Sequence, residues 1–288
     1  MASNLTQRLM VAAVAIPAAV LIVWYGGLPL ALLLAAVGAL GVRELFDLAA
    51  RTGVKPLTAV GMSGAAAMAP LMWVALQPGA LGVGLRAGWP LLALGWLLVV
   101  LVATLAVRPP DSRPLASAAV TILGVAYCGV LPATLLLLRH GSHGTMSWAG
   151  AGLALLPLVI TWVCDTAAMV AGKTIGGPRL APTVSPGKTR AGGVAGLIGG
   201  VIAAFAMLHL ALVPAGIHIH APELLLLGLS VSAVAQAGDL VESLFKREAG
   251  VKDSSALIPG HGGVLDRFDS LYFAIPVAWG LLRTFGTV

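Results

Sequence analysis

The chain has 288 residues, of which 59% are hydrophobic and only 10% are charged, and its mean hydropathy is +0.98. Soluble domains carry roughly 25% charged residues, so this composition excludes an ordinary soluble protein. The formal net charge of +6 comes from loop lysines and arginines. No basic, aromatic-laced soluble face accompanies it, so nucleic acid is not an expected partner.

Long runs of Leu, Ala, Val and Gly divide the chain into segments that are long enough to cross a bilayer. A transmembrane helix needs about 20 apolar residues, whereas an outer-membrane barrel would show alternating segments of about ten. We therefore predict an all-α, polytopic integral membrane protein. It should form one membrane-embedded domain, with N-terminal spans in 1–147 and catalytic helices and loops in 148–288. The nine or so expected spans are 10–25, 28–46, 57–76, 90–107, 115–138, 148–172, 193–213, 223–245 and 268–282.

Features near the spans leave some alternatives open. The first run could be a cleaved signal peptide, but Trp24 and Tyr25 at its end favour a retained span with an interfacial aromatic belt. Residues 78–88 are interpreted as a turn. The second span ends in three charged residues, which either pair with one another or help wall a polar site: Arg43, Glu44 and Asp47.

Other polar residues are expected to be structural. Cys128 and Cys164 both lie in apolar runs, without disulfide or zinc spacing, and are interpreted as small buried hydrophobes. Arg139, His140 and His143 are interpreted as ordinary loop residues.

A carboxylate, Asp165, interrupts the sixth apolar run near its C-terminal end. An acidic group at that depth should face other helices or a polar cavity. Two interpretations stay open for it: a ligand or charge partner in a site, or a structural salt bridge or hydrogen bond between helices.

The loop at 173–190 gathers basic and hydroxyl side chains. Two Gly-Lys-Thr tripeptides, at 172–174 and 187–189, resemble parts of a phosphate loop, but neither has the full Walker spacing after a strand. The second one stands directly before an apolar helix, where amides, a lysine and hydroxyls can hold phosphate. The candidate residues there are Ser185, Lys188 and Thr189.

Charge concentrates most strongly between residues 236 and 270. Four polar residues recur there at i, i+3, i+4 and i+7, which places them on one helix face. They are Asp239, Glu242, Ser243 and Lys246. Glu242 precedes Lys246 by four residues, the orientation that favours an ion pair.

A glycine-rich loop at 259–263 follows that helix, and its backbone amides could approach an anion closely. Asp266 and Asp269 then open the next apolar helix, where the positive end of the helix dipole suits a carboxylate. Carboxylates that hold a divalent cation, beside bases that neutralise phosphate, are the groups that phosphoryl or nucleotidyl transfer needs.

The spacing of these residues resembles the signature of phosphatidate cytidylyltransferases, also called CDP-diacylglycerol synthases. Asp165 with the downstream block at 185–189 resembles a second element of that family. Members commonly continue this block with Trp-Glu-Gly, whereas this chain has Arg190-Ala191-Gly192, so no role is carried over to residues 190 and 191. The main signature reads Ser243-Leu-Phe-Lys246-Arg247, four residues, Lys252-Asp253, and then Ile258-Pro-Gly-His261-Gly-Gly-Val-Leu-Asp266-Arg267-Phe-Asp269.

The resemblance implies a metal-dependent nucleotidyltransferase of phospholipid biosynthesis, which joins CTP and phosphatidic acid to give CDP-diacylglycerol and pyrophosphate. It implies Mg²⁺ held by Asp239 and Asp266, with Asp165 and Asp269 as further candidate ligands. The implied catalytic residues are Lys246, Arg247, Lys252, Asp253, His261 and Arg267. The implied substrate-binding residues are Ser185, Lys188, Thr189, Ser243, Gly262 and Gly263.

Charge placement agrees with nine spans and a cytoplasmic N-terminus. Of the 17 lysines and arginines, only Arg86, Arg139 and Arg283 then fall on the outer side, a bias that the positive-inside rule expects. Both basic clusters fall on the cytoplasmic face, where nucleoside triphosphates are found. We therefore expect a multi-pass protein of the cell (inner) membrane with its active site on the cytoplasmic face.

Two other functions stay open. Asp165 and Asp239, with glycine-broken helices, would also suit a cation-coupled transporter, although such transporters commonly carry paired repeats that this sequence lacks. A nucleotidyltransferase that acts on another lipid phosphate would need the same groups. No residue selects cytosine or an acyl chain by a route that we can derive, and a homodimer is left open.

Overall fold

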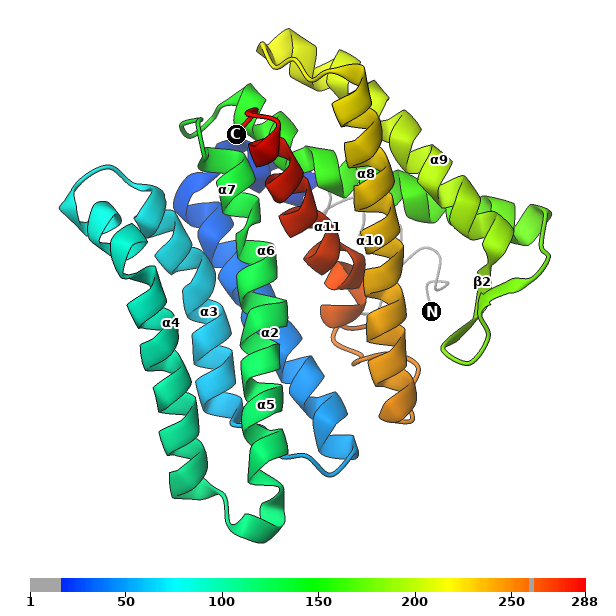
Figure 1. Cartoon of the computed structure of the whole chain (residues 1–288). Helices are drawn as coiled ribbons and strands as arrows, with labels where there is room; N and C mark the ends of the chain where they lie inside the picture. Colours follow the sequence, from blue (N-terminus) through cyan, green and yellow to red (C-terminus); the bar gives the residue numbers. More distant parts are fainter. Residues whose placement is uncertain (1–16, 259–261) are drawn as a thin grey trace, which may run out of the picture.

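A computed structural model describes residues 17–258 and 262–288 (Figure 1). Helices dominate these residues, and residues 17–25 are the helical end of the first apolar run. The α-helices are α2 (Gly27–Arg51), α3 (Thr58–Leu76), α4 (Ala80–Val107), α5 (Pro114–Gly124), α6 (Leu131–Ala133), α7 (Leu135–His140), α8 (Trp148–Thr174), α9 (Arg190–Met207), α10 (Ala221–Glu248) and α11 (Leu265–Thr284). Short 3₁₀ turns lie at Pro110–Ser112 and Val213–Ala215, π-helical turns at Val125–Val130 and Leu208–Leu212, and strands at Arg179–Ala181 (β1) and Ser185–Thr189 (β2).

Seven helical segments within the described residues are long and apolar enough to cross a membrane. The prediction of a mostly all-α, multi-pass protein is therefore confirmed. The count of nine stays a prediction, because residues 10–16 of the run at 10–25 lie outside the described residues. The last predicted span, α11, is not among the seven, and charged side chains crowd its first turns at Asp266, Arg267 and Asp269.

The fourth span is longer than the sequence predicts, and the turn expected at 78–88 is wrong. The break between α3 and α4 is confined to a few residues around Gly79, whose φ of 106° is a conformation that favours glycine. Helix α4 begins at Ala80 and continues through Pro90. Proline and glycine suggest a turn in water, but membrane helices tolerate both.

The loop expected at 173–190 contains a small antiparallel hairpin, which adds two short strands to the helical fold. Strand β1 pairs with β2, with Arg179 opposite Thr189 and Ala181 opposite Ser185. Thr189 ends β2 and is also the N-cap of α9, because its Oγ1 accepts a hydrogen bond of 3.1 Å from the Gly192 amide. The hairpin is thus held to the start of α9.

Arg139 is not the ordinary loop residue that the sequence suggests. Its side chain is fully buried and donates hydrogen bonds to the carbonyl oxygens of Val23 (2.7 Å), Trp24 (2.5 Å) and Gly144 (2.8 Å). The last carbonyls of a helix lack partners within that helix, so Arg139 satisfies the end of the segment at 17–25. The neighbouring His140 accepts a hydrogen bond of 2.7 Å from the Gly27 amide.

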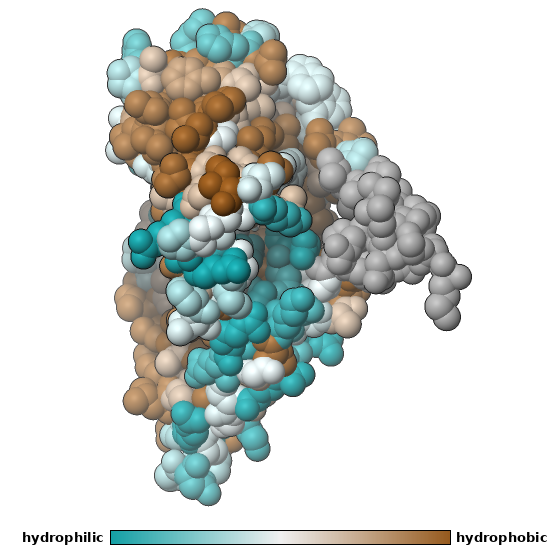
Figure 2. Space-filling model, turned by 90° about the vertical axis from the view of Figure 1, so that its right-hand side faces the viewer, coloured by the Kyte–Doolittle hydropathy of each residue, from teal (hydrophilic) through white to brown (hydrophobic). Residues whose placement is uncertain are grey.

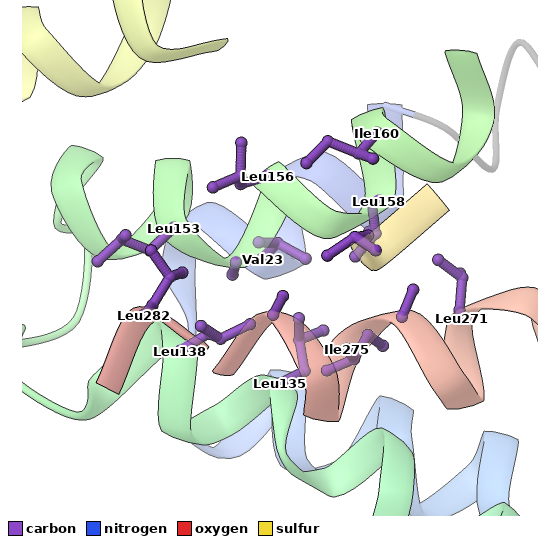
Figure 3. Close-up of a cluster of buried hydrophobic side chains, with 14 of the residues drawn as sticks. Val23, Leu135, Leu138, Leu153, Leu156, Leu158, Ile160, Leu271, Ile275 and Leu282 are labelled. Carbon is purple, nitrogen blue, oxygen red and sulfur yellow. The ribbon is translucent and has the colours of Figure 1, made fainter. Parts of the chain in front are cut away.

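Helix α11 runs through the middle of the helical assembly and packs against α2, α6, α7, α8 and α10 (Figure 1). One buried cluster joins Leu271, Ile275 and Leu282 of α11 with leucines of α7 and α8 (Figure 3). Lipid is as apolar as leucine, so such helices are held together in a bilayer mainly by close packing. This packing fixes the first turn of α11 beside α10, where the charged residues gather.

Candidate active site

A cavity of about 690 Å³ lies where α8, the hairpin, α9, α10 and the start of α11 meet. The face of the molecule that carries the hairpin shows hydrophilic residues gathered around a hollow, below an apolar upper part (Figure 2). The charged residues that line the cavity are Asp165, Lys173, Arg179, Lys188, Asp239, Lys246, Asp253, Asp266, Arg267 and Asp269.

Helix α10 presents the polar face that its spacing predicts. Ser243 Oγ donates a hydrogen bond of 3.4 Å to Asp239 Oδ1, and Lys246 forms an ion pair with Glu242 one turn away. Glu242 is fully buried, so the contact with Lys246 offsets part of the cost of burying its carboxyl group. The ion pair predicted from the i, i+4 spacing is confirmed.

An ion pair joins the hairpin to α10. Lys188 Nζ lies 2.5 Å from Asp239 Oδ2, and about 30% or less of each side chain is exposed. The residues before α9 and the charged stretch of α10 are far apart in the sequence, yet they contribute to one cavity. Thr189 and Gly187 line the same wall.

A second lysine–carboxylate pair joins α10 to α11. Lys246 Nζ lies 2.7 Å from Asp266 Oδ1. Asp266 Oδ2 accepts hydrogen bonds from the Ser254 amide (2.9 Å), the Ser254 hydroxyl (2.8 Å) and the Gly263 amide (2.8 Å). Burial by itself raises the pKa of Asp266, but Lys246 and these donors outweigh it and lower the pKa to about 2. Asp266 therefore stays a carboxylate at neutral pH.

The carboxylates on the cavity wall are of the kind that binds magnesium, although they do not form a closed ligand cage. Asp165, Asp239 and Asp269 come from three different helices and line one cavity. In the part of the chain that the structure describes, no three acidic, histidine or cysteine side chains converge closely enough to hold a metal ion. Mg²⁺ is usually bound by one or two carboxylates together with substrate phosphates and water, so this donor set fits it in kind.

Several predicted site residues do not line the cavity. Arg247 donates hydrogen bonds to the carbonyl oxygens of Val184 (3.2 Å) and Val251 (3.0 Å), so it links α10 to the hairpin turn. Lys252 is exposed, and Ser185 begins β2. His261 lies outside the described residues. Ser243, Gly262 and Gly263 do not line the cavity themselves, but they lie next to residues that do.

Sequence reasoning missed other residues at the site. Lys173 and Arg179 were visible as bases in the 173–190 loop, and the structure places both on the cavity wall. Gln236 also lines it and donates a hydrogen bond of 3.2 Å to the Gly193 carbonyl oxygen. Glu44 was expected to pair with neighbouring charges or to wall a polar site. It instead contacts donors of the loop before α11 and the first amides of that helix.

The chain matches a family model over nearly its whole length. The model is described as the Cytidylyltransferase family and covers residues 6–285. The chain belongs to this family. The resemblance carried by the residue 243–269 signature is therefore confirmed.

Named relatives of this cytidylyltransferase-family chain agree. It is 30% identical over 282 residues to a phosphatidate cytidylyltransferase of Bacillus subtilis, which covers 98% of this chain and 99% of that protein. It is 43% identical over 141 residues to one of Haemophilus influenzae, over 49% of this chain and 48% of that protein. A Staphylococcus saprophyticus relative of the same name is 36% identical over 160 residues, or 57% of its length. The chain thus matches about half the length of the Haemophilus and Staphylococcus relatives.

Proposed function

We propose that this protein is a phosphatidate cytidylyltransferase, which joins CTP and phosphatidic acid to give CDP-diacylglycerol and pyrophosphate. The observation that carries this proposal is the pair of lysine–carboxylate contacts, Lys188 with Asp239 and Lys246 with Asp266, on one cavity wall. Lys188 belongs to one block of the family signature, Lys246 and Asp266 belong to the other, and Asp239 lies one helical turn before that second block. The names of the relatives supply the substrate class.

The proposed reaction is an in-line substitution at phosphorus. A phosphate oxygen of phosphatidic acid forms a bond to the α-phosphorus of CTP, while the bond from that phosphorus to the bridging oxygen breaks and pyrophosphate leaves. A phosphate monoester is already an anionic nucleophile, so the site needs no strong general base. Catalysis then rests on positioning and on electrostatic stabilisation.

The basic side chains of the cavity supply that stabilisation. Lys173, Arg179 and Lys188 approach from the α8–hairpin side, and Lys246 and Arg267 from the α10–α11 side. A triphosphate and a lipid phosphate bring several negative charges together, and charge-assisted contacts from opposite walls bind and align both. Arg247, through its hydrogen bonds to Val184 and Val251, holds the hairpin turn toward α10.

We propose Mg²⁺ as the cofactor, held by Asp239 and Asp266, with Asp165 and Asp269 as further candidate ligands. When bound, it would supply positive charge against the triphosphate. Asp239 and Asp266 each contact a lysine in the structure. Both lysines line the cavity, where their ammonium groups can contact phosphate oxygens.

We also propose that the protein lies in a bacterial-type inner membrane and that its cavity opens on the cytoplasmic face. The connection at 108–113 and the C-terminal end of α10 lie at the same end of the molecule, and the connection between α7 and α8 lies at the other (Figure 1). Arg108 and Arg113 belong to the connection between α4 and α5, and Lys246 and Arg247 stand in the last turn of α10. The positive-inside rule and the supply of nucleoside triphosphate both favour the cytoplasm for that end.

The direct test is an assay of the purified protein with phosphatidic acid, Mg²⁺ and each nucleoside triphosphate in turn. We expect a nucleotide-linked lipid and an equal amount of pyrophosphate with CTP, and much less product with ATP, GTP or UTP. Product with a different lipid phosphate but none with phosphatidic acid would assign the chain to a sibling reaction. Absence of any nucleotide-linked lipid would refute the proposal.

A further inference from the structure

Glu44 is a buried carboxylate on α2, in the half of the chain that carries none of the family signature. Only 4% of it is exposed. Within the described residues no lysine or arginine forms an ion pair with it. A buried carboxylate is costly unless hydrogen bonds compensate it, so its partners are informative.

Four donors surround this carboxylate, and all belong to the loop before α11 or to its start. Glu44 Oε1 accepts from the Ser255 hydroxyl (2.7 Å) and the Val264 amide (3.0 Å). Glu44 Oε2 accepts from the Ser254 hydroxyl (3.0 Å) and the Leu265 amide (2.7 Å). A carboxylate has acceptor capacity for all four, and it satisfies amides that have no partner within α11.

Ser254 connects this buried group to the proposed active site. Its hydroxyl oxygen lies 3.0 Å from Glu44 Oε2 and 2.8 Å from Asp266 Oδ2, and its amide also donates to Asp266. A hydroxyl has one hydrogen, so it donates to one carboxylate at a time and bridges the two. Gly263 packs against the same point: a Cβ there would collide with Ser254 Oγ and with the Glu44 carboxylate.

We infer that Glu44 is a positioning residue for the transfer reaction. It fixes Ser254 and the first turn of α11, and these in turn aim Asp266 at Lys246 and at the cavity. The N-terminal half of the chain therefore takes part in the site through one side chain. This inference rests on the proposed function for its kinetic consequence, but not for its geometry.

Replacement by glutamine separates acceptor capacity from shape. The side-chain NH₂ group of glutamine cannot accept a hydrogen bond, so whichever way it turns it leaves the Val264 or the Leu265 amide without its acceptor. The serine hydroxyl on the same side must also reverse and accept, because it then faces a donor. We expect Glu44→Gln to lower kcat by at least about tenfold, because small displacements of aligned groups cost that much or more. The KM for phosphatidic acid should stay within about twofold. Asp47→Asn is the matched control, because Asp47 is an exposed carboxylate one turn along the same helix.

The experiment is a double-mutant cycle with Glu44→Gln and Ser254→Ala on folded, monodisperse protein. Each single variant should lower kcat, and the double variant should fall no further than the worse single variant, because both break the same connection. Ser255→Ala, which removes a donor that does not reach Asp266, should lower the melting temperature with little loss of kcat. Multiplicative losses in the double variant, or normal kcat with only a lower melting temperature in Glu44→Gln, would overturn the inference.

Hydrogen exchange keeps this test separate from the proposed function. Glu44→Gln should speed exchange of the amides at 263–266 by about tenfold or more, and Asp47→Asn should not. If the wild-type protein makes no liponucleotide, the proposed function fails, yet the exchange result still decides whether Glu44 holds this turn. Unchanged protection in Glu44→Gln would overturn the inference. If Glu44→Gln does not fold, the test rests on Ser254→Ala. This variant should show the loss of kcat, and a normal kcat in it would overturn the inference.

Discussion

Lys188 is the side chain through which the hairpin reaches the carboxylates of α10. It pairs with Asp239 and lines the cavity. Losing one charge-assisted phosphate contact costs about 1.5–3 kcal/mol, so Lys188→Ala should lower kcat/KM roughly ten- to a hundredfold. Lys55→Ala is the control, because Lys55 is an exposed lysine at the end of the molecule that we propose to be cytoplasmic. Initial rates that fall equally in both variants would place phosphate binding elsewhere.

Asp165 is the carboxylate whose role the sequence leaves most open. The structure puts it on the cavity wall with Asp239 and Asp269, which favours a role in the site over a distant structural one. We predict that Asp165→Asn lowers activity by at least about tenfold and raises the Mg²⁺ concentration needed for half-activation, because removing charge weakens a hard-cation site. Asp111→Asn, at an exposed turn, is the control. An Asp165→Asn enzyme with normal activity and normal Mg²⁺ dependence would assign the residue to helix packing.

At the scale of single elements, the spacing of residues along the sequence predicts those contacts that form within one helix. The face of α10 follows from helical periodicity, so the ion pair of Glu242 with Lys246 could be predicted from the sequence. The contacts of Glu44 could not, because its partners lie 210 or more residues away and depend on how α2 packs beside α11. The hairpin was missed for another reason: its strands have only three and five residues, and β2 contains a proline and a glycine, which disfavour strands.

The helix at 17–25 offers a test of element stability. Arg139 is fully buried and donates to the last carbonyl oxygens of that segment. Arg139→Ala leaves these carbonyls without their donor, at a cost of about 1–3 kcal/mol or more, and about 2–4 °C of melting temperature is lost per kcal/mol in a chain of roughly this size. Arg86→Ala, with an exposed side chain, should change the melting temperature less. Activity per folded molecule of Arg139→Ala should be retained. Equal melting temperatures for Arg139→Ala and the wild type would contradict this account of Arg139.

At the scale of the whole molecule, composition and hydropathy are enough to predict a multi-pass helical protein, and seven segments in the described residues are long and apolar enough to span a membrane. The number of spans is harder to predict, because α11 is a partly buried helix whose first turn is charged. Its role depends on packing against five other helices and not on its own hydropathy.

Topology can be tested with single cysteines. Ser112 lies in the connection between α4 and α5, and Ser142 lies in the connection between α7 and α8, at opposite ends of the molecule (Figure 1). In intact cells, a membrane-impermeant maleimide should label Ser142→Cys and spare Ser112→Cys, which should react only after lysis. The native Cys128 and Cys164 are buried and provide little background. Labelling of Ser112→Cys from outside would reverse the proposed orientation.

The fate of the two ends of the nucleotide tests the central claim most directly. The purified protein is incubated with phosphatidic acid and Mg²⁺, and with CTP labelled either at the α-phosphorus or at the γ-phosphorus. We predict that the α label enters the lipid and the γ label is recovered in pyrophosphate, in equal molar amounts. Transfer of the γ label to the lipid, or no label in lipid from either nucleotide, would contradict cytidylyl transfer by this protein.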